Sequence, residues 1–461
     1  MPKGKFDKYL KILLPMKDEF FSARRLLPVH YDISLKTAPH LGTVDVEALI
    51  TVEVPPEPVP FLRLYLGLPG LTTVSLQQVL LGGHSAQYTY RSPRLTIMPP
   101  SLPRAGQRLV ICVAYSAKPG APKNYTGPRG SELNAEFLWL PLVGFPDRAF
   151  SAHGVTRVPV GEETAFLGKC LRRKEEDGWV VAEWETEAPI TLPAFVSGPF
   201  SRFEGVAGDG TSAEAAGKTT VTVLVQHGYE RSASRLVKDV AGAMATGTSW
   251  FGELPLTQVF VVQPRRREYG QYAHMPFVVL TRDDVLRDQD ETKERRLFQA
   301  VAHELGHFWW GNIVRSNVLD EGWLSEGFAD FAKILAVEQV FGLGARADLL
   351  SRMLEDLRKA GPGPALGEVK AGHPGQPAIV RRQGGLFLQA YRQRLGDEAA
   401  KRFFRALFAR FQNGIITTAA FEEFALAEMP ASGRPGMAEF LQRHLHDQVT
   451  YRVDNDGRVL A

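Results

Sequence analysis

Two histidines and a glutamate are the residues of this 461-residue chain whose types and spacing could do chemistry. His303 and His307 stand four positions apart, and Glu304 directly follows the first of them. On a helix, side chains four positions apart leave the same face, so both imidazoles can reach one metal ion. Glu304 would leave the helix about 100° from His303, where it can flank the metal as a base without binding it.

This short pattern also occurs by chance on solvated helices, so further residues have to support it. Glu326 follows His307 after eighteen intervening residues and can supply a third ligand. Two imidazoles and one carboxylate leave a fourth position for water, which is typical of a catalytic zinc. Asp330, one helical turn after Glu326, could accept a hydrogen bond from a ligand histidine and fix its tautomer. The pattern predicts a Zn2+ site with His303, His307 and Glu326 as ligands.

The same stretches carry a family resemblance. Residues 303–312 read HELGHFWWGN and residues 323–329 read WLSEGFA. They resemble the zinc signature of the aminopeptidase N family of gluzincin metallopeptidases, of which this chain would be a divergent member. The resemblance implies a peptide substrate, a Zn2+ cofactor held in part by Glu326, and Glu304 as general base. Asp330 resembles the aspartate that supports the zinc site in the wider thermolysin-like group.

A second family motif, Gly-x-Met-Glu-Asn, departs from its usual form here. In the family its glutamate holds the free amine of the substrate. The matching segment, residues 270–276, reads GQYAHMP, and His274 stands near the place of the missing glutamate. The resemblance makes His274 and Gln271 candidate substrate-binding residues. The alternative is that His274 only caps or lines the cleft, and strict aminopeptidase specificity is therefore an open question.

A third motif, in which a family tyrosine stabilises the oxyanion, also differs. Arg381 occupies the expected position of that tyrosine in the stretch 381–387. An arginine stays protonated and can stabilise an oxyanion electrostatically, but it can equally mark a site whose original chemistry is lost. Tyr391 lies ten residues further on, in a helical pattern, where core packing is the simpler role. We expect Arg381 rather than Tyr391 to be the oxyanion donor.

The rest of the chain must supply the elements that position these residues. Period-2 alternation separated by proline and glycine clusters predicts antiparallel strands up to residue 203, and helical periodicity dominates the second half. The fold class is therefore an N-terminal antiparallel β sandwich or saddle followed by a thermolysin-like, mostly helical catalytic domain. The predicted parts are an N-terminal segment, a β domain, a glycine-rich linker and the catalytic domain, at residues 1–24, 25–206, 208–218 and 218–461. Helices are predicted at 232–251, 291–312, 321–341, 345–358, 384–395 and 398–412.

Composition narrows the class of protein. The chain is 44% hydrophobic and 23% charged with a net charge of +3, which is typical of a globular protein. No basic patch with interleaved aromatic residues or nucleic-acid motif stands out, so we expect no nucleic-acid partner. No apolar run approaches the roughly 20 residues of a transmembrane helix. We expect a cytoplasmic protein whose segment 1–24 docks on the fold or contacts a membrane surface; the oligomeric state is not defined.

Two classes of function fit these observations. The first is a zinc peptidase with altered recognition of the substrate amine and undefined exo- or endo-specificity. The second is a zinc-containing peptide-binding or scaffold protein with little or no turnover, because two family motifs are altered. Another hydrolase on the same metal site, such as an epoxide hydrolase, has no residue that favours it. Glu304 favours an enzyme, since a purely structural zinc has no use for an unligated glutamate beside it.

Overall fold

The computed structural model describes residues 25–57, 59–121, 123–144, 148–207, 219–264, 270–281, 291–373, 375–454 and 457–461. The predicted N-terminal segment 1–24 and the predicted linker 208–218 lie outside these residues. The chain forms two compact units. The first unit comprises Met1–Glu204, Thr222–Ser234 and Leu256–Leu286, and the second comprises Gly205–Val221, Arg235–Pro255 and Arg287–Ala461. The domain boundaries at residues 24, 206 and 218 stay a prediction.

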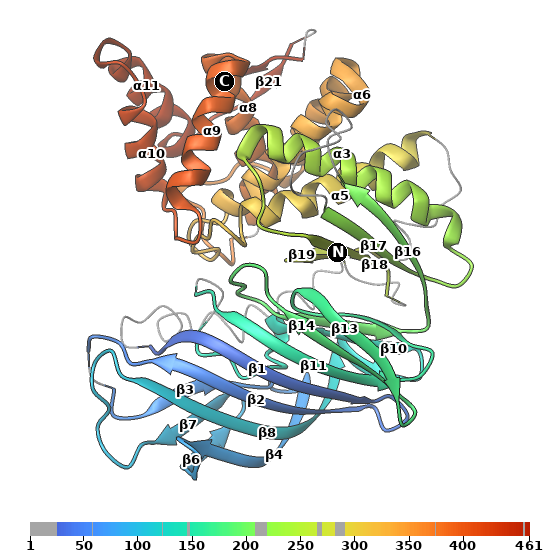
Figure 1. Ribbon diagram of the computed structural model, residues 1–461. Coiled ribbons are helices and arrows are strands. Elements are labelled where there is room, and N and C mark those ends of the chain that lie inside the picture. Colours follow the sequence, from blue (N-terminus) through green and yellow to red (C-terminus); the bar gives the residue numbers. More distant parts are fainter. Residues whose placement is uncertain are drawn as a thin grey trace. The chain divides into compact units, whose positions relative to one another are not determined.

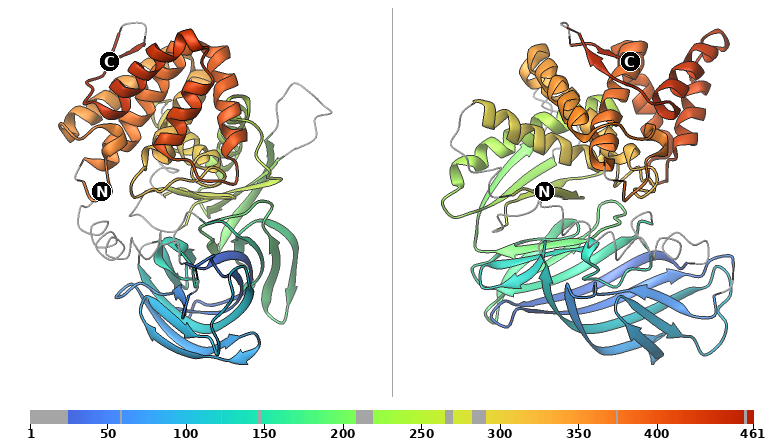
Figure 2. Two further views of the ribbon diagram at one scale, coloured as in Figure 1. Left: turned by 90° about the vertical axis from the view of Figure 1, so that its left-hand side faces the viewer. Right: turned by 180° about the vertical axis from the view of Figure 1, so that it is seen from behind.

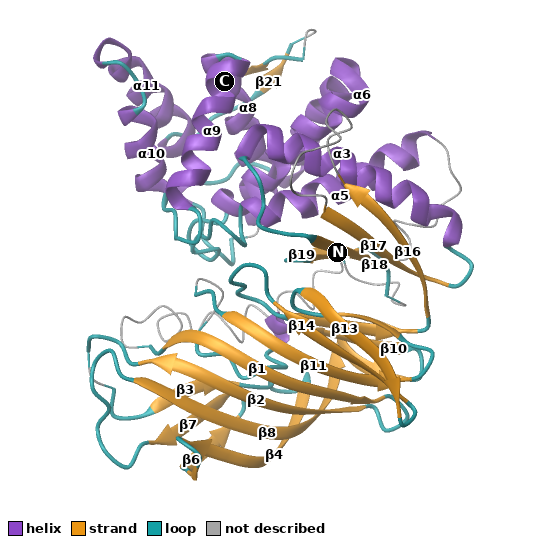
Figure 3. Cartoon of the chain, in the orientation of Figure 1, coloured by secondary structure: helices purple, strands orange, loops and turns teal. Residues whose placement is uncertain are grey.

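The first unit is built on a curled twelve-stranded sheet (Figures 1 and 3). Strand β2 (Thr43–Glu53) shows why these residues form it, since every second residue from Val44 to Val52 is buried and those between face outward. The strand order is β12-β15-β10-β9-β8-β2-β1-β11-β14-β13, and β4 pairs with β5 and β8. The other strands are β1 (Leu27–Ala38), β4 (Thr72–Leu81), β5 (His84–Ser85), β8 (Arg108–Ala121), β9 (Asn124–Gly127), β10 (Gly130–Asn134), β11 (Ser151–Pro159), β12 (Glu163–Ala165), β13 (Lys169–Glu176), β14 (Trp179–Glu185) and β15 (Ala194–Gly198).

Besides the large sheet, the chain forms a sheet of three strands and a sheet of five. Strands β3 (Leu62–Tyr65), β7 (Arg94–Met98) and β6 (Gln87–Arg91) form a three-stranded sheet, and a short helix η2 spans Ala135–Phe137. A five-stranded sheet has the order β16-β17-β18-β20-β19. Its strands are β16 (Phe200–Ala207), β17 (Thr219–Gln226), β18 (Gln258–Val262), β19 (Tyr272–His274) and β20 (Phe277–Val279). Strand β19 pairs antiparallel with β20, which sets His274 opposite Phe277 at the strand end.

The second unit is mostly helical, as predicted (Figure 2). The helices predicted at 321–341 and 345–358 are both present within α6 (Trp323–Ala360), where the non-helical backbone of Gly342, at φ 81°, separates two helical segments by a kink. A glycine adopts this conformation without steric cost. The short helix η3 (Glu230–Ser232) belongs to the first unit. The remaining elements are α3 (Ala233–Phe251), α5 (Glu291–Trp309), η4 (Leu366–Glu368), α7 (Gln376–Ala378), η5 (Ile379–Gln383), α8 (Gly384–Leu395), α9 (Asp397–Phe411), α10 (Thr418–Ala427), η6 (Ala431–Gly433), α11 (Arg434–Leu441), η7 (Gln442–His446), β21 (Arg452–Val453) and β22 (Val459–Leu460).

An aromatic core holds these helices together. Trp310, directly after α5, stacks on Phe328 of α6 with 4.0 Å between the ring centroids, and both rings are fully buried. Aromatic rings of this size dominate core energetics, and pairs of them prefer stacked or edge-to-face contacts. The cluster extends through the C-terminal helices by way of Phe251, Phe331, Phe404, Phe387, Tyr391, Phe403 and Phe421. Among the described residues, no helix is long and apolar enough to span a membrane.

Candidate metal centre

Three side chains converge between α5 and the first turn of α6. His303 and His307 leave the same face of α5, and their ring centroids are 4.9 Å apart. The Nε2 atom of His303 lies 3.4 Å from Oε2 of Glu326, and Nε2 of His307 lies 3.8 Å from Oε1. One ligand atom from each residue lies within 4.8 Å of the others, a spacing that could hold a metal ion. Their side chains are 3%, 13% and 37% exposed, so the Glu326 side faces solvent.

Glycines allow the helices to approach closely enough for this convergence. A Cβ atom on Gly306, between the two histidines, would lie 2.9 Å from both Cα of Ala329 and Cβ of Ala332. A Cβ atom on Gly327, directly after Glu326, would lie 2.9 Å from Cα of Gly384. Real Cβ atoms do not approach other atoms this closely because the interior is packed to hard contact. The backbones of α5, α6 and α8 therefore touch beside the candidate ligands.

The two histidines are oriented by different partners. Nδ1 of His303 lies 2.7 Å from Oδ1 of Asp330, within hydrogen-bonding distance. Nδ1 of His307 lies 3.3 Å from the carbonyl oxygen of Trp310 and 3.2 Å from Oγ of Ser325. A proton on Nδ1 leaves the lone pair of Nε2 available to a metal. The predicted partner of a ligand histidine, Asp330, thus lies against His303.

Asp330 is the centre of a charged cluster, which we call the Asp330 network: Asp330, Lys333, Arg382 and Asp356. The carboxylate of Asp330 is fully buried. Lys333 Nζ donates to Oδ1 at 2.6 Å, and Arg382 Nη1 donates to Oδ2 at 2.7 Å. Arg382 Nε also donates to Asp356 at 3.0 Å. Burial alone would raise the pKa of Asp330, but Lys333, His303 and Arg381 outweigh it and hold this pKa well below its usual range.

Arg381, on the short π-helix η5, lies against the same ligand atoms. Its Nε is 3.3 Å from Oε2 of Glu326, and its Nη2 is 3.0 Å from Nε2 of His303. Burial would raise the pKa of Glu326, yet Arg381 and His307 lower it strongly, so the carboxylate is ionised. Oε2 of Glu326 is buried and meets no well-aligned donor among the described residues. An ionised carboxylate whose two oxygens each lie near one imidazole fits a metal ligand, although the Arg381 guanidinium would have to turn away from Nε2 of His303.

Glu304 is buried on α5 with 5% of its surface exposed. Its carboxylate raises the pKa of His307 and the pKa of Arg381, so it acts electrostatically on both neighbours of the site. The net pKa of His307 is nevertheless lowered, because burial disfavours the imidazolium more strongly. A neutral imidazole is the form that a metal needs. The structure therefore groups Glu304 with the three candidate ligands.

His274 and Gln271 belong to the first unit. His274 is 5% exposed, and its Nε2 lies 3.1 Å from Oδ1 of Asn134 on β10. Its ring also lies 4.9 Å from the ring of Tyr272. Gln271 is partly buried just before β19. Their roles toward a substrate stay a prediction.

Tyr391 takes the packing role that the sequence allowed. Its ring is fully buried among the aromatic residues of α8 to α10, and its hydroxyl has no hydrogen-bond partner among the described residues. Burial raises its pKa far above the usual value. A neutral hydroxyl enclosed in the core cannot reach a substrate carbonyl. Of the two candidate oxyanion donors, only Arg381 lies beside the candidate metal ligands.

Sequence reasoning missed Asn134, Lys333 and Arg382. Lys333 offered a signal, because it follows Asp330 by three positions within an otherwise apolar helical run. Arg382 was seen only as the neighbour of Arg381. Asn134 gave no signal, because its contact with His274 joins residues 140 positions apart.

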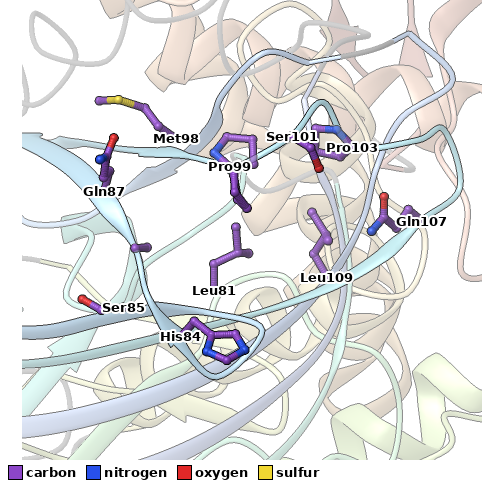
Figure 4. A pocket seen from close by; sticks show the side chains of 12 residues that line it. Leu81, His84, Ser85, Gln87, Met98, Pro99, Ser101, Pro103, Gln107 and Leu109 are labelled. Carbon is purple, nitrogen blue, oxygen red and sulfur yellow. The ribbon is translucent and has the colours of Figure 1, made fainter.

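A hollow of about 570 Å³ lies elsewhere, in the first unit (Figure 4). Its lining is mostly apolar and proline-rich, and His84 is its single titratable residue. It contains none of the candidate catalytic residues. The volume of this hollow therefore does not locate the candidate active site. The three candidate metal ligands locate it better.

Comparison with known proteins agrees with this geometry. Residues 246–443 match the peptidase family M1 domain. Leucyl aminopeptidase of Saccharolobus solfataricus is 26% identical over 207 residues, which are 44% of this chain and 25% of that protein. Aminopeptidase M1-A of Oryza sativa is 24% identical over 307 residues, which are 62% of this chain and 33% of that protein. The chain thus spans between a quarter and a third of the length of these curated relatives.

The fold is shared with a solved M1 zinc metallopeptidase from Deinococcus radiodurans. The TM-score is 0.73 at 18% identity, covering 94% of this chain and 97% of that one. A mutant of an M1 zinc metallopeptidase from the same organism, bound to a Tyr-Ser-Ala substrate, gives a TM-score of 0.76 over 92% of this chain and 95% of that one. The match to the peptidase family M1 domain, that of the aminopeptidase N family of gluzincins, covers residues 246–443 and includes all three candidate ligands. Zn2+ is the metal that this family implies for the His-His-Glu group.

Proposed function

We propose that this protein is a zinc-dependent peptidase that hydrolyses peptide bonds with Glu304 as general base. The observation that carries the proposal is the convergence of His303, His307 and Glu326, with Nδ1 of His303 2.7 Å from Asp330 and Nδ1 of His307 3.3 Å from the carbonyl oxygen of Trp310. Two imidazoles and one carboxylate that meet at one point are the donor set of a catalytic zinc, in which the fourth position is left for water. Buried Glu304 beside it would serve no purpose in a structural metal site.

The proposed division of labour follows from the positions of the side chains. Zn2+ at this site would polarise a peptide carbonyl and acidify water. Glu304 would accept a proton from that water and return it to the leaving amine. Arg381, once turned from Nε2 of His303, would donate to the oxyanion that develops on the carbonyl. Its pKa is raised: burial works against the charge, but Glu326 and Asp330 outweigh burial, so it remains a cation throughout.

The proposed specificity differs from that of a strict aminopeptidase. In place of a glutamate that would pair with a substrate ammonium, the segment offers His274, whose Nε2 already contacts Asn134. An imidazole carries no negative charge in either protonation state, so it cannot attract a substrate ammonium group as a glutamate does. We therefore expect peptides with free and blocked N-termini to be cleaved at similar rates.

A fluorogenic peptide panel tests the proposal. Free and acetylated versions of each peptide would be compared on the zinc-loaded wild type and on Glu304→Gln. We expect Glu304→Gln to lose about 10²–10⁴-fold in kcat while keeping its zinc, because only the proton-transfer group is removed. Unchanged hydrolysis by this variant would defeat the mechanism.

The alternative is a zinc-containing peptide-binding protein with little turnover. The observation in its favour is Arg381, which replaces the tyrosine of the family and contacts a candidate ligand atom. Tight binding of the same peptides by zinc-loaded wild type, without detectable cleavage, would establish this alternative.

A further inference from the structure

Two buried cations hold one carboxylate behind the candidate metal site. We propose that Lys333 and Arg382 are positioning residues for Zn2+, acting through Asp330 to fix the imidazole of His303. The inference rests on the proposed metal site. Both residues donate to Asp330 and not to a candidate ligand, so each would act on His303 through Asp330.

The geometry fixes both oxygens of the carboxylate. Lys333 lies one helical turn after Asp330, with 6% of its side chain exposed, and donates to Oδ1 at 2.6 Å. Arg382 comes from η5 and donates to Oδ2 at 2.7 Å. Oδ1 also lies 2.7 Å from Nδ1 of His303. With a donor on each oxygen, the carboxylate cannot rotate without breaking a charge-assisted hydrogen bond.

Charge balance alone does not explain two cations. Asp356 balances the charge of Arg382 and Asp330 that of Lys333, but this balance does not require both cations to contact Asp330, one on each oxygen. Arg381 is a third cation, 4.0 Å from Oδ1, but it would have to leave Nε2 of His303 when a metal binds. Lys333 and Arg382 are the partners that stay. Their distinct places, one on each oxygen, indicate that orientation is what they supply.

The arrangement also links separate elements. His303 comes from α5, Asp330 and Lys333 from α6, and Arg382 from η5. Arg382 is anchored in turn by Asp356, further along α6, at 3.0 Å. Partners of this kind around a ligand histidine set its tautomer and basicity, and their loss typically lowers metal affinity by about 10–100-fold.

The test uses Lys333→Met and Arg382→Met in the full chain. Zinc affinity would be measured by competition with a chelator, and ligand geometry by the visible absorption of the cobalt-substituted protein. We expect each variant to bind zinc about 10–100-fold more weakly and to show an altered cobalt spectrum. Lys333→Arg, which restores a cation, should recover part of the affinity.

The control is Arg392→Met. The side chain of Arg392 is 5% exposed, which is close to the 6% of Lys333. It pairs with Glu338 and Asp397 in the same unit. It should lose thermal stability but keep wild-type zinc affinity and cobalt spectrum. Wild-type values in both test variants, or an equal fall in zinc affinity for Arg392→Met, would overturn the inference. If Lys333→Met does not fold, Arg382→Met, whose side chain is 24% exposed, decides the matter alone. Zinc affinity and the cobalt spectrum are measured without peptide. If the protein binds zinc as expected but cleaves no peptide, the proposed function is wrong and this inference still holds.

Discussion

The second unit contains two buried charge clusters that look alike and differ in what they touch. The Asp330 network surrounds one carboxylate with cations and reaches the imidazole of His303. The other cluster, which we call the Arg392 network (Arg392, Glu338, Arg346 and Asp397), surrounds one guanidinium with carboxylates. Arg392 forms a two-pronged bond to Glu338 at 2.6 and 2.9 Å. It ties α6 to α8 and reaches Asp397 at the start of α9.

The difference separates two uses of buried charge. A bidentate pair such as Arg392–Glu338 has defined geometry and joins helices, and it touches none of the candidate ligands. In the Asp330 network, by contrast, Oδ1 of Asp330 contacts a candidate metal ligand, His303. We therefore distinguish a ligand-bearing half (α5, the first turns of α6, and η5) from a supporting half (the later turns of α6, α8 to α11, and η7). Changes in the supporting half should alter stability without altering the metal site.

Substitution of the central carboxylate of each network should show the largest difference in effect between the ligand-bearing half and the supporting half. Asp330→Ala removes the carboxylate paired with buried Lys333, which should cost about 3–5 kcal/mol of unfolding free energy; Glu338→Ala should cost less, because Arg392 keeps its pair with Asp397. Only Asp330→Ala should also weaken zinc binding, by about 10–100-fold. Urea unfolding of the metal-free proteins and chelator competition measure the two effects. A matching loss of zinc affinity in Glu338→Ala would remove the distinction.

A buried histidine gives the supporting half its own response to pH. Nδ1 of His444 on η7 lies 2.6 Å from the hydroxyl of Tyr451. Burial, assisted by Arg443 and Arg394, lowers the pKa of His444 from 6.5 to about 4. The contribution of His444 to the free energy of unfolding is complete above the pKa that this histidine has in the unfolded chain. It declines as pH falls toward the lower pKa of the folded chain, because only the unfolded chain binds the extra proton in that range.

Between about pH 7 and pH 5, the wild type should lose about 2 kcal/mol more stability than His444→Gln, which cannot titrate. Urea unfolding of both metal-free proteins at the two pH values measures this difference, and other titrating groups cancel in the comparison. Parallel pH profiles would show that His444 titrates normally in the folded protein.

Two glycine-to-alanine substitutions should distinguish the two halves by effects of intermediate size. Gly306→Ala places a Cβ 2.9 Å from the backbone of Ala329, so α5 and α6 must move apart. We expect a loss of about 1–3 kcal/mol in unfolding free energy and weaker zinc binding. The control is Gly344→Ala in the later part of α6, where no atom lies within 4 Å of the new Cβ. That change should stabilise by up to about 1 kcal/mol, and thermal melts with and without zinc distinguish the two.

The smallest effect is expected from Tyr391→Phe. The change removes a buried hydroxyl that has no partner among the described residues, so stability should shift by less than about 1 kcal/mol. Peptide hydrolysis should be unchanged. Arg381→Met, in contrast, should lower kcat by about 10²–10³-fold if the guanidinium donates to the oxyanion. A large kcat loss in Tyr391→Phe would reverse these two roles.

Much of the fold could be predicted from the sequence because its periodicities are local. Alternation along residues 44–52 predicted β2, and the four-residue spacing of His303 and His307 predicted a shared helix face. The predicted break between residues 341 and 345 is also present, as the non-helical backbone of Gly342 within α6.

Long-range pairings were out of reach. The helix η5 brings Arg381 within 3.3 Å of Glu326, 55 positions earlier in the chain, and nothing in residues 379–383 signals that approach. The same holds for Arg382 and Asp330, whose contact depends on how two helices pack. The family resemblance supplied the candidate position of Arg381, while the supporting cations came only from the structure.

The mutual approach of Gly327 and Gly384 has a consequence for metal selectivity. A Cβ on either residue would lie within 2.9 Å of the Cα of the other, so the main chains of α6 and α8 are already at their closest distance directly beside Glu326. The two helices therefore cannot move closer together to tighten the site around an ion smaller than Zn2+. Such an ion would have to be reached by rotation of the Glu326 side chain, which is 37% exposed, so the fit of the site to small cations depends on this one side chain.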